Sequence, residues 1–237
     1  MNTSQPPLIE LSGVSKSYSQ SSEIFHALQQ VDLKIDSGQL VAIVGKSGSG
    51  KTTLLNMIAG IDRPTAGRIT VNGVQIDGMS ERQLAQWRGV NVGIVFQFFQ
   101  LLPTLTVVEN VMLPMDLCNT FHRSIRRRRA IQLLEMVDVA EQADKLPSSL
   151  SGGQQQRAAV ARALANDPPI LLADEPTGNL DSSTARTVFR MFTDLSNGGK
   201  TVILVTHERE LADSFDVVYE MTDGVIAQRT GSQIVSP

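Results

Sequence analysis

The chain has 237 residues, of which 41% are hydrophobic and 19% are charged, with a formal net charge of −3. This composition is sufficient for a full hydrophobic core, and the slightly acidic balance gives no reason to expect nucleic-acid binding. The single cysteine, Cys118, excludes an internal disulfide framework. No stretch has the roughly 18 to 20 apolar residues of a membrane helix, and residues 1–7 do not resemble a secretory signal, so we expect a soluble, cytoplasmic protein.

The first part of the chain predicts strands around a glycine-rich loop. Apolar alternation indicates strands over residues 8–18 and 27–35, and a β-branched apolar run predicts a buried strand over 39–44. Gly45 ends this run, and a helix is expected over 51–61. A strand, a glycine loop and a helix in this order are the structural context that a phosphate-binding loop requires.

A hairpin and a short helix follow. Residues 68–71 and 74–76 flank an Asn-Gly pair, which predicts a tight β-turn. A capping-box pattern beginning at Ser80 predicts a helix that ends at Arg88, and residues 91–96 predict another strand.

The middle of the chain, residues 107–164, changes to helical patterns. Alternation of strands and helices then resumes, which predicts a mostly parallel sheet with right-handed crossovers. The last residues, 229–237, carry no pattern and are expected to be loose. The elements expected after the helical stretch are strands over 170–173, 201–205, 217–221 and 225–228, and helices over 182–195 and 209–214.

Residues 45–52 fit the pattern G-x-x-x-x-G-K-[ST] of a phosphate-binding loop. Its glycines allow consecutive N–H groups to turn inward around a phosphate. Lys51 places a charge on the β and γ phosphates, and the Thr52 hydroxyl can ligate Mg²⁺. The alternative is a glycine-rich turn before an ordinary helix, which the flanking elements disfavour. The residues expected at the nucleotide are Gly45, Lys46, Ser47, Gly48, Ser49, Gly50, Lys51, Thr52 and Thr53.

Two acids follow the apolar run at residues 170–173. In open α/β sheets, ligands bind at the carboxyl ends of the strands. Asp174 is therefore placed to hold Mg²⁺, and Glu175 to act as general base on a water beside the γ-phosphate. A strand that ends in a solvated acidic turn is the alternative, and the phosphate loop upstream favours the functional interpretation.

A second candidate phosphate contact begins after Leu150. Ser151 and Gln154 form a capping box at the expected start of a helix. This pattern leaves Gly152 and Gly153 unexplained, because glycine in a helix costs up to about 1 kcal/mol relative to alanine. Close approach of an anionic ligand to the bare backbone would explain both glycines, since the helix dipole favours negative charge there.

Residues 150–154, followed by Gln155-Gln156-Arg157, resemble the signature motif of the ATP-binding-cassette (ABC) ATPases. The resemblance extends over residues 8–228, and the motifs occur in the family's order. It implies an α/β fold: a P-loop NTPase core with a mostly parallel sheet, an antiparallel β subdomain and an inserted helical subdomain.

The resemblance also implies boundaries within a single domain of residues 1–237. The core and the β subdomain would occupy approximately 8–96 and 166–228. The helical subdomain, which carries the signature motif, would occupy approximately 97–165.

Further roles follow only from the resemblance. Tyr18 matches the aromatic residue that stacks on adenine, and Gln97 the glutamine that senses Mg²⁺ and the attacking water. His207 matches the histidine that contacts the γ-phosphate, and residues 179–181 match the segment that touches the other subunit. Taken alone, each of these has a plain structural alternative. The implied catalytic residues are Glu175, His207, Gln97 and Lys51, and the implied Mg²⁺ ligands are Thr52, Gln97 and Asp174.

The family's assembly is implied as well. Two chains would pair head to tail, with each ATP between the glycine loop of one chain and Ser151, Gly152, Gly153 and Gln154 of the other. ATP would close the dimer and hydrolysis would release it, because the site is complete only when closed.

Residues 96–111 and 176–181 resemble the MacB and LolD type of ABC ATPase. This branch implies a separate transmembrane permease subunit, used for export or mechanotransmission, with or without a periplasmic adaptor protein. The ATPase would then be peripheral on the inner face of the cell membrane, without nucleic acid. The apolar residues after Gln97 suit either a groove for a partner's coupling helix or the core of the helical subdomain: Phe98, Phe99, Leu101 and Leu102.

Two rival interpretations and one charge run stay open. The same ATPase could serve a non-transport membrane complex, such as an FtsE-like cell-division system. A nucleotide-gated module without hydrolysis is the other rival, against which Glu175 and His207 argue. The run Arg126–Arg129 is expected to be a solvated helix face, with a surface facing anionic lipid as the alternative.

Overall fold

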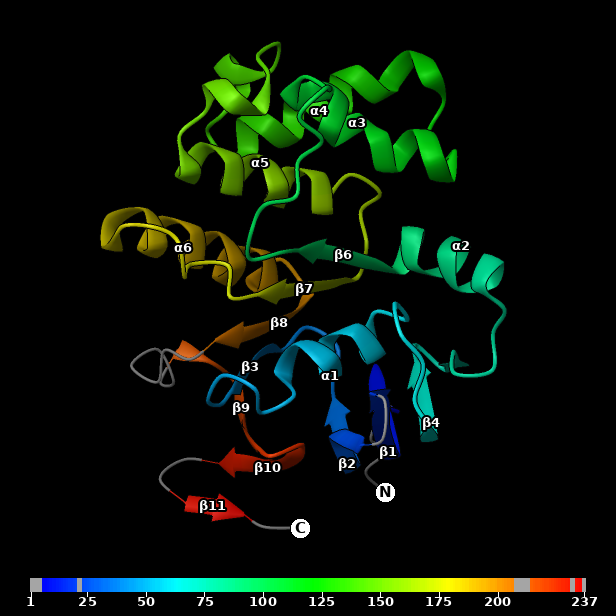
Figure 1. The fold of residues 1–237 in the computed structure, drawn as a ribbon. Coiled ribbons are helices and arrows are strands. Elements are labelled where there is room, and N and C mark those ends of the chain that lie inside the picture. Colours follow the sequence, from blue (N-terminus) through cyan, green and yellow to red (C-terminus); the bar gives the residue numbers. More distant parts are fainter. Residues whose placement is uncertain (1–5, 21–22, 207–213, 231–232, 236–237) are drawn as a thin grey trace, which may run out of the picture. The chain divides into compact units, whose positions relative to one another are not determined.

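The computed structural model describes residues 6–20, 23–206, 214–230 and 233–235 (Figure 1). The chain forms two compact units. Unit 1 comprises Met1–Ala85 and Ile203–Pro237, and unit 2 comprises Gln86–Val202. Two elements, α2 (Glu81–Asn91) and β8 (Thr201–Thr206), each begin in one unit and end in the other.

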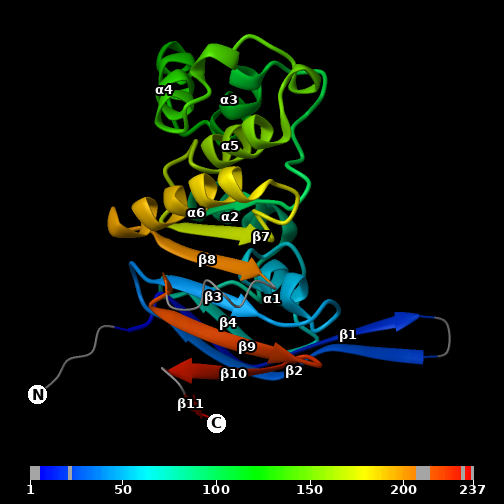
Figure 2. The same cartoon turned by 90° about the vertical axis from the view of Figure 1, so that its left-hand side faces the viewer.

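Unit 1 contains a four-stranded antiparallel sheet built on a long hairpin. The β1–β4 ladder ends at the pair Ser15↔Ala66, whereas the β1–β2 ladder continues to Gln20↔Glu23. Figure 2 shows this hairpin projecting beyond the other strands of its sheet. The sheet has the order β2-β1-β4-β5, with β1 (Ile9–Gln20), β2 (Glu23–Ile35), β4 (Ala66–Val71) and β5 (Val74–Gln75).

The second group of strands in unit 1 begins with a fully buried strand. All five residues of β3 (Leu40–Val44) are buried, as the apolar run predicted, and the strand pairs in parallel with β9 (Val217–Thr222). α1 (Lys51–Ile58) follows β3 after the glycine loop. Beyond β9, the sheet continues antiparallel through β10 (Val225–Thr230) and β11 (Gln233–Val235).

The prediction that residues 229–237 are loose was wrong for part of this segment. β10 extends to Thr230, and β11 pairs with it at Gln228↔Val235 and Thr230↔Gln233. An edge strand of this kind is formed by main-chain hydrogen bonds, which need no apolar alternation and therefore leave no pattern to detect. The helix expected over 209–214 lies outside the described residues except for Ser214.

Unit 2 combines two parallel strands with helices. β6 (Val92–Val95) pairs in parallel with β7 (Ile170–Asp174), which confirms the two buried strands expected there. The helical stretch is also confirmed, and three of its helices pack against one another (Figure 1). The helices are α3 (Val107–Cys118), α4 (Arg123–Met136), α5 (Gly152–Ala163) and α6 (Ser182–Asn197), with short 3₁₀ turns at Ala140–Gln142 and Pro147–Ser149.

The arginine run on α4 is partly internal, which corrects the expectation of a solvated face. Arg126 is only 3% exposed, and its guanidinium donates to Phe121 O at 2.7 Å, Asp116 Oδ1 at 2.5 Å and Asn119 Oδ1 at 2.6 Å. The guanidinium carbon of Arg129 lies 4.4 Å from the centre of the Phe121 ring. Burying a guanidinium is costly unless its donors are paired, and here Asp116 on α3 and two residues of the loop before α4 supply the partners.

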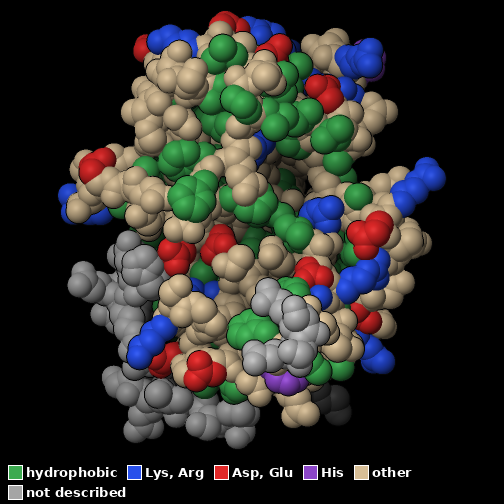
Figure 3. Space-filling model, viewed as in Figure 1, with side chains coloured by type: hydrophobic (Ala, Val, Ile, Leu, Met, Phe, Trp, Pro, Cys, Tyr) green, Lys and Arg blue, Asp and Glu red, His purple; other side chains and the backbone are tan. Residues whose placement is uncertain are grey.

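Hydrophobic side chains reach the surface of the helical part of unit 2 (Figure 3). Phe98 is 71% exposed and Leu102 is 43% exposed, while Phe99 and Leu101 are half-buried. The four apolar residues after Gln97 thus divide between surface and interior. Within the part of the chain that the structure describes, no helix has the length and apolar character needed to cross a membrane.

Candidate nucleotide site

The Lys51 side chain folds back onto the glycine loop and is hydrogen-bonded to its backbone. Its Nζ atom donates to the carbonyl oxygens of Gly45 and Lys46, both at 2.9 Å, and the residue is 6% exposed. An ammonium group has three N–H donors, one more than these two bonds use. The loop therefore holds its cation in place, with donor capacity for a phosphate oxygen.

Three glycines of the loop are required by backbone geometry. Gly48 and Gly50 have φ values of 80° and 104°, in the left-handed region that favours glycine. A Cβ atom at Gly50 would lie 2.5 Å from Ala27 O, and one at Gly45 would lie 2.4 Å from Met221 O. Neighbouring backbone thus leaves no room for a side chain at Gly45 and Gly50, whereas Gly48 has open space and is favoured by its φ alone.

Ser49 carries a buried hydroxyl without a hydrogen-bond partner among the described residues. Its backbone is satisfied, because its N–H donates to Lys46 O at 3.2 Å and its carbonyl accepts from Gly224 N at 2.9 Å. An unsatisfied buried hydroxyl costs roughly 1–3 kcal/mol. A ligand oxygen at the loop would remove that cost.

The start of α1 adds a further anion-binding feature. Gly50 is the N-cap residue and provides no side-chain hydrogen bond to the first turn, which contains no acidic residue. The N–H groups of a first helical turn and the helix dipole together favour a negative charge. The phosphate-loop prediction thus rests on a cation, an orphaned hydroxyl and an uncapped helix end in unit 1.

Tyr18 lies on the projecting part of β1 and is 37% exposed. Its hydroxyl donates to Asp62 Oδ2 at 2.8 Å, and the Nζ atom of Lys16 lies 4.8 Å from the ring centre. Burial and then the contact with Asp62 raise the pKa of the Tyr18 phenol. The ring is thus a tethered surface aromatic rather than a freely rotating one.

Gln97 and Glu175 come together in unit 2, although 78 positions separate them in the chain. Gln97 Nε2 donates to Glu175 Oε2 at 3.3 Å, and Asn179 Nδ2 donates to Gln97 O at 3.2 Å. Glu175 has a φ of 44°, a left-handed conformation that costs a non-glycine residue about 1–3 kcal/mol. Strain of this kind is concentrated at functional sites, and Glu175 directly follows β7.

The capping box at α5 is confirmed. Ser151 N donates to Gln154 Oε1 at 2.9 Å, and Gln154 N donates to Ser151 Oγ at 3.3 Å. These reciprocal bonds begin the helix at Gly152.

Gly153 also has a packing explanation, which the sequence did not reveal. A Cβ atom there would lie 2.6 Å from Thr184 Cγ2, so close packing between α5 and α6 already excludes a side chain. A Cβ atom at Gly152 would meet only Phe99 Cζ, at an ordinary 3.8 Å. Gly152 alone thus has room for a side chain, and packing does not account for the glycine.

Arg162 is a residue of this region that sequence reasoning missed. Its guanidinium donates to the carbonyl oxygens of Phe99 and Gln100, which have φ values of 52° and 50°. Burial lowers the pKa of Arg162. Arg162 fixes the strained turn that follows Gln97. The one feature of the sequence that could have indicated this role is a basic residue in the last turn of α5.

The predicted site residues fall in both units. The glycine loop, Thr52 and Tyr18 belong to unit 1, whereas Gln97, Asp174, Glu175 and the turn at 151–154 belong to unit 2. His207 lies outside the described residues. Within unit 2 the structure places Gln97 beside Glu175, and within unit 1 it places the Lys51 ammonium against the glycine loop. The geometry of each of these two clusters is described by itself.

Residues 28–178 match the family model described as "ABC transporter". The chain belongs to this family. It is 42% identical to the lipoprotein-releasing system ATP-binding protein LolD of Xylella fastidiosa, over 96% of this chain and 95% of LolD. It is 43% identical to the macrolide export ATP-binding/permease protein MacB of Agrobacterium fabrum, over 93% of this chain but only 34% of MacB.

A solved structure confirms the fold class of this ABC ATPase. The dimeric structure of a post-hydrolysis state of the ATP-binding cassette MJ0796, bound to ADP and Pi, matches with a TM-score of 0.87. MJ0796 is from Methanocaldococcus jannaschii, and the structural match has 39% identity over 96% of this chain and 98% of the other. The chain is an ATP-binding subunit of the ABC transporter type, and an ATPase.

Proposed function

We propose that this ABC ATPase hydrolyses Mg²⁺-ATP to drive a separate transmembrane permease subunit of the MacB/LolC-E type, in export or mechanotransmission. The observation that carries the proposal is the near full-length similarity to LolD, together with the match to about the ATP-binding third of MacB. One relative is named for lipoprotein release and the other for macrolide export. The ATPase would then act on the inner face of the membrane, and an adaptor is a further candidate partner.

Each residue proposed at the nucleotide would have a distinct role. The loop residues Gly45 to Thr53 would surround the phosphates, with the Lys51 ammonium and the Ser49 hydroxyl as donors. Tyr18 would stack on the base, a contact worth about 1–3 kcal/mol by analogy with base stacking in nucleic-acid complexes. Glu175 would accept a proton from the attacking water, with Gln97 orienting both groups.

The residues proposed for Mg²⁺ fit the ion's chemistry. Thr52, Gln97 and Asp174 offer a hydroxyl, an amide and a carboxylate oxygen, and Mg²⁺ binds oxygen ligands almost exclusively. No group of three or more His, Cys, Asp or Glu side chains suited to a metal occurs among the described residues, which fits an ion held mainly by phosphates and water. When bound, Mg²⁺ neutralises charge on the β and γ phosphates. His207 would add a donor to the γ-phosphate.

A head-to-tail homodimer completes the proposal. MJ0796 forms a dimer in its ADP- and Pi-bound structure. In the present chain, the uncrowded Gly152 at the N-terminus of α5 suits a partner's γ-phosphate beside Ser151, Gly153 and Gln154. Each ATP would then be clasped by two copies, and hydrolysis would separate them.

Site-specific crosslinking tests the membrane partner. A photoreactive residue at Phe98, which is 71% exposed, should crosslink a permease with a large extracytoplasmic domain when both are expressed together in native membranes. The matched control is Leu117, an equally apolar α3 residue that is 76% exposed, at which no permease adduct should form. A cell-division membrane protein recovered at Phe98 would instead support the non-transport alternative and contradict the proposal.

A further inference from the structure

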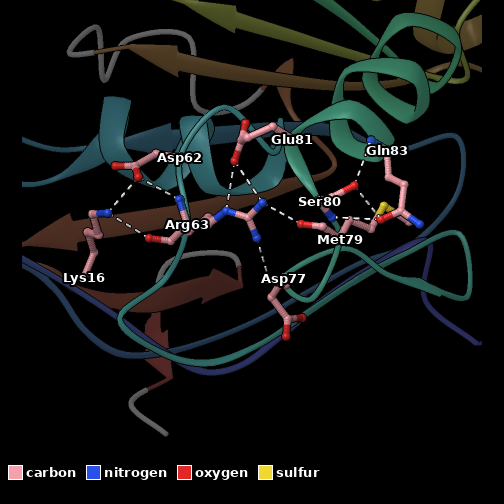
Figure 4. Close-up of polar contacts among 8 residues, drawn as sticks. All are labelled: Lys16, Asp62, Arg63, Asp77, Met79, Ser80, Glu81 and Gln83. Carbon is pink, nitrogen blue, oxygen red and sulfur yellow. Dashed lines mark hydrogen bonds and ion pairs between the residues drawn. The ribbon is translucent and has the colours of Figure 1, made fainter.

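Asp62 is the centre of a polar cluster at the base of the projecting hairpin in unit 1, and no role has yet been given to it. Its carboxylate accepts from Lys16 Nζ at 2.7 Å, from the Tyr18 hydroxyl at 2.8 Å and from Arg63 N at 2.7 Å. Figure 4 shows Lys16 and Arg63 converging on it. We call Asp62, Lys16, Tyr18 and Arg63 the Asp62 cluster. Desolvation alone would raise the pKa of Asp62, but the hydrogen bonds from Lys16, Tyr18 and Arg63 outweigh it, so the pKa is lowered and the group is ionised at neutral pH.

Tyr18 needs such a tether because of where it lies on β1. The β1–β4 ladder ends at Ser15, so Tyr18 belongs to a two-stranded ribbon in which β1 pairs with β2. A ribbon of two strands is marginally stable by itself. Without further contacts, the ring would move with the hairpin instead of with the phosphate loop.

The tether connects Tyr18 to the helix that begins at the phosphate loop. α1 starts at Lys51 and ends at Ile58, and Asp62 follows shortly after it. Burial and Asp62 raise the pKa of the Tyr18 phenol, and the side chain of Thr53, in the first turn of α1, opposes this shift. The phenol therefore interacts with both the first turn of α1 and the segment that follows the helix.

The backbone around Asp62 is itself fixed to β1. Thr65 N donates to Ser15 O at 2.8 Å, and Ser17 N donates to Thr65 Oγ1 at 3.0 Å. Lys16 Nζ also donates to Arg63 O at 2.8 Å. Three successive residues of β1 thus bind the strand to residues 62–65.

Arg63 anchors the other side of this segment. Its guanidinium donates to Glu81 Oε1 through Nε at 3.0 Å and through Nη2 at 2.8 Å, and to Asp77 O at 3.2 Å (Figure 4). A guanidinium held by several acceptors at once has little freedom to reorient. The carboxylate of Asp62 is thereby presented to Tyr18 from a rigid support.

We propose that Asp62 is a positioning residue for nucleotide recognition, which holds the Tyr18 ring at a set distance from the phosphate loop so that base and phosphates are bound together. The inference rests on the proposed function, in which Tyr18 stacks on the base. Lys16 contributes by placing its ammonium over one face of the ring, so that a base must use the opposite face. Asp62 touches no part of the nucleotide itself.

The test compares two ligands that share phosphates but not a base. Calorimetry with ATP and with inorganic tripolyphosphate measures the base contribution to affinity in the full chain. In Asp62→Ala, ATP should bind about fivefold more weakly, the effect of losing one hydrogen bond, while tripolyphosphate binding changes by less than about twofold. Asp62→Asn retains an acceptor oxygen for Tyr18 and should recover most of the ATP affinity.

Two controls separate positioning from general damage. Glu10→Ala removes an ion pair with Lys34, at 3.0 Å, on the same two strands and should leave the binding of both ligands as in the wild type. Tyr18→Phe should weaken ATP binding by itself, and adding Asp62→Ala to it should cause little further loss, because both changes break the same contact.

Three outcomes decide the matter. Equal weakening of both ligands in Asp62→Ala would show a purely structural role and overturn the inference. A wild-type chain that prefers ATP, with the full preference kept in Asp62→Ala, would overturn the inference but leave the proposed function intact. A wild-type chain that binds ATP no more tightly than tripolyphosphate would overturn the base site at Tyr18, and the inference with it.

Discussion

Gln97 Nε2 lies 3.3 Å from Glu175 Oε2, and this hydrogen bond joins the loop after β6 to the residue after β7. β6 and β7 are parallel neighbours, paired at Val95↔Ala173, so their carboxyl ends lie side by side. Gln97 begins the segment that includes the exposed Phe98. A displacement of that segment by a membrane partner would therefore act directly on the proposed general base.

Replacing Glu175 with Gln should preserve ATP binding but stop hydrolysis, because an amide cannot accept the proton of the attacking water. If ATP holds two copies together, the variant should accumulate as a dimer when ATP and Mg²⁺ are present. Size-exclusion chromatography with light scattering measures this. A monomeric elution profile in ATP would count against the proposed head-to-tail dimer.

Replacing Lys51 with Ala should weaken ATP binding by about tenfold or more, since charge-assisted hydrogen bonds contribute roughly 1.5–3 kcal/mol. The bonds to Gly45 O and Lys46 O would be lost at the same time, which loosens the loop. Equilibrium binding of ATP is the measurement. Lys34→Ala serves as the matched control, because that side chain is 69% exposed; unchanged affinity in Lys51→Ala would mean that the phosphates bind elsewhere.

Replacing Ser151 with Arg should leave ATP binding to one chain unchanged but abolish steady-state hydrolysis, because the large cation would face the partner's nucleotide. Loss of the cap would also cost about 1 kcal/mol of stability. Ser151→Ala loses the same cap without adding bulk, and it isolates the steric effect. Normal turnover in Ser151→Arg would remove this serine from the proposed interface.

Alanine at the two glycines of the α5 turn should have opposite effects on the melting temperature. Gly153→Ala places a Cβ atom 2.6 Å from Thr184 Cγ2 and should destabilise the protein. Gly152→Ala meets no close neighbour and should be neutral or stabilising by up to about 1 kcal/mol.

Combining Gly153→Ala with Thr184→Ser provides the rescue. Serine lacks the offending methyl group but retains the hydroxyl that donates to Asp181 Oδ2 at 2.6 Å. The double variant should therefore recover most of the lost stability. Identical melting temperatures for the two single alanine variants would contradict the packing explanation.

The ionisation of Tyr18 reports on its tether in the absence of nucleotide. Burial and the negative charge of Asp62 raise the pKa of the phenol, so the phenolate should form at a lower pH in Asp62→Asn than in the parent chain. Ultraviolet titration in a Tyr219→Phe background measures Tyr18 alone, because these are the two tyrosines of the chain. Since the pKa is higher in the folded state, this contribution to stability is present at neutral pH and is lost as the pH rises through the folded pKa. An unchanged titration curve in Asp62→Asn would show that Asp62 does not hold the phenol in solution.

Local patterns predicted the short-range features correctly. The turn at Asn72-Gly73 has φ values of 50° and 73°, as an Asn-Gly hairpin requires. The capping box at Ser151, the buried strand before the phosphate loop and the two acids at the end of β7 could be predicted in the same way. Each of these depends on residues within a few positions of one another, for which side-chain chemistry and backbone geometry are directly linked.

Contacts between residues far apart in the chain could not be predicted from the sequence. Arg126 looked solvated because its four-residue run is charged, yet Asp116 on α3 and the loop before α4 supply acceptors that make its burial tolerable. Gly153 had no local explanation in the sequence, whereas Thr184 on α6 leaves no room for a side chain there. β11 could not be predicted from apolar alternation, because main-chain hydrogen bonds to β10 form this strand.

The sequence by itself determined the family, the phosphate loop and the identity of the groups that could perform the chemistry, because these are carried by residue type at fixed spacing. The tertiary structure decided which of those groups meet. Gln97 reaches Glu175, and Tyr18 is tied to Asp62 across 44 positions, only because the paired strands and α1 bring separate segments together. The spacing of residues along a chain specifies local geometry, but the folding of the whole chain sets the distances between segments.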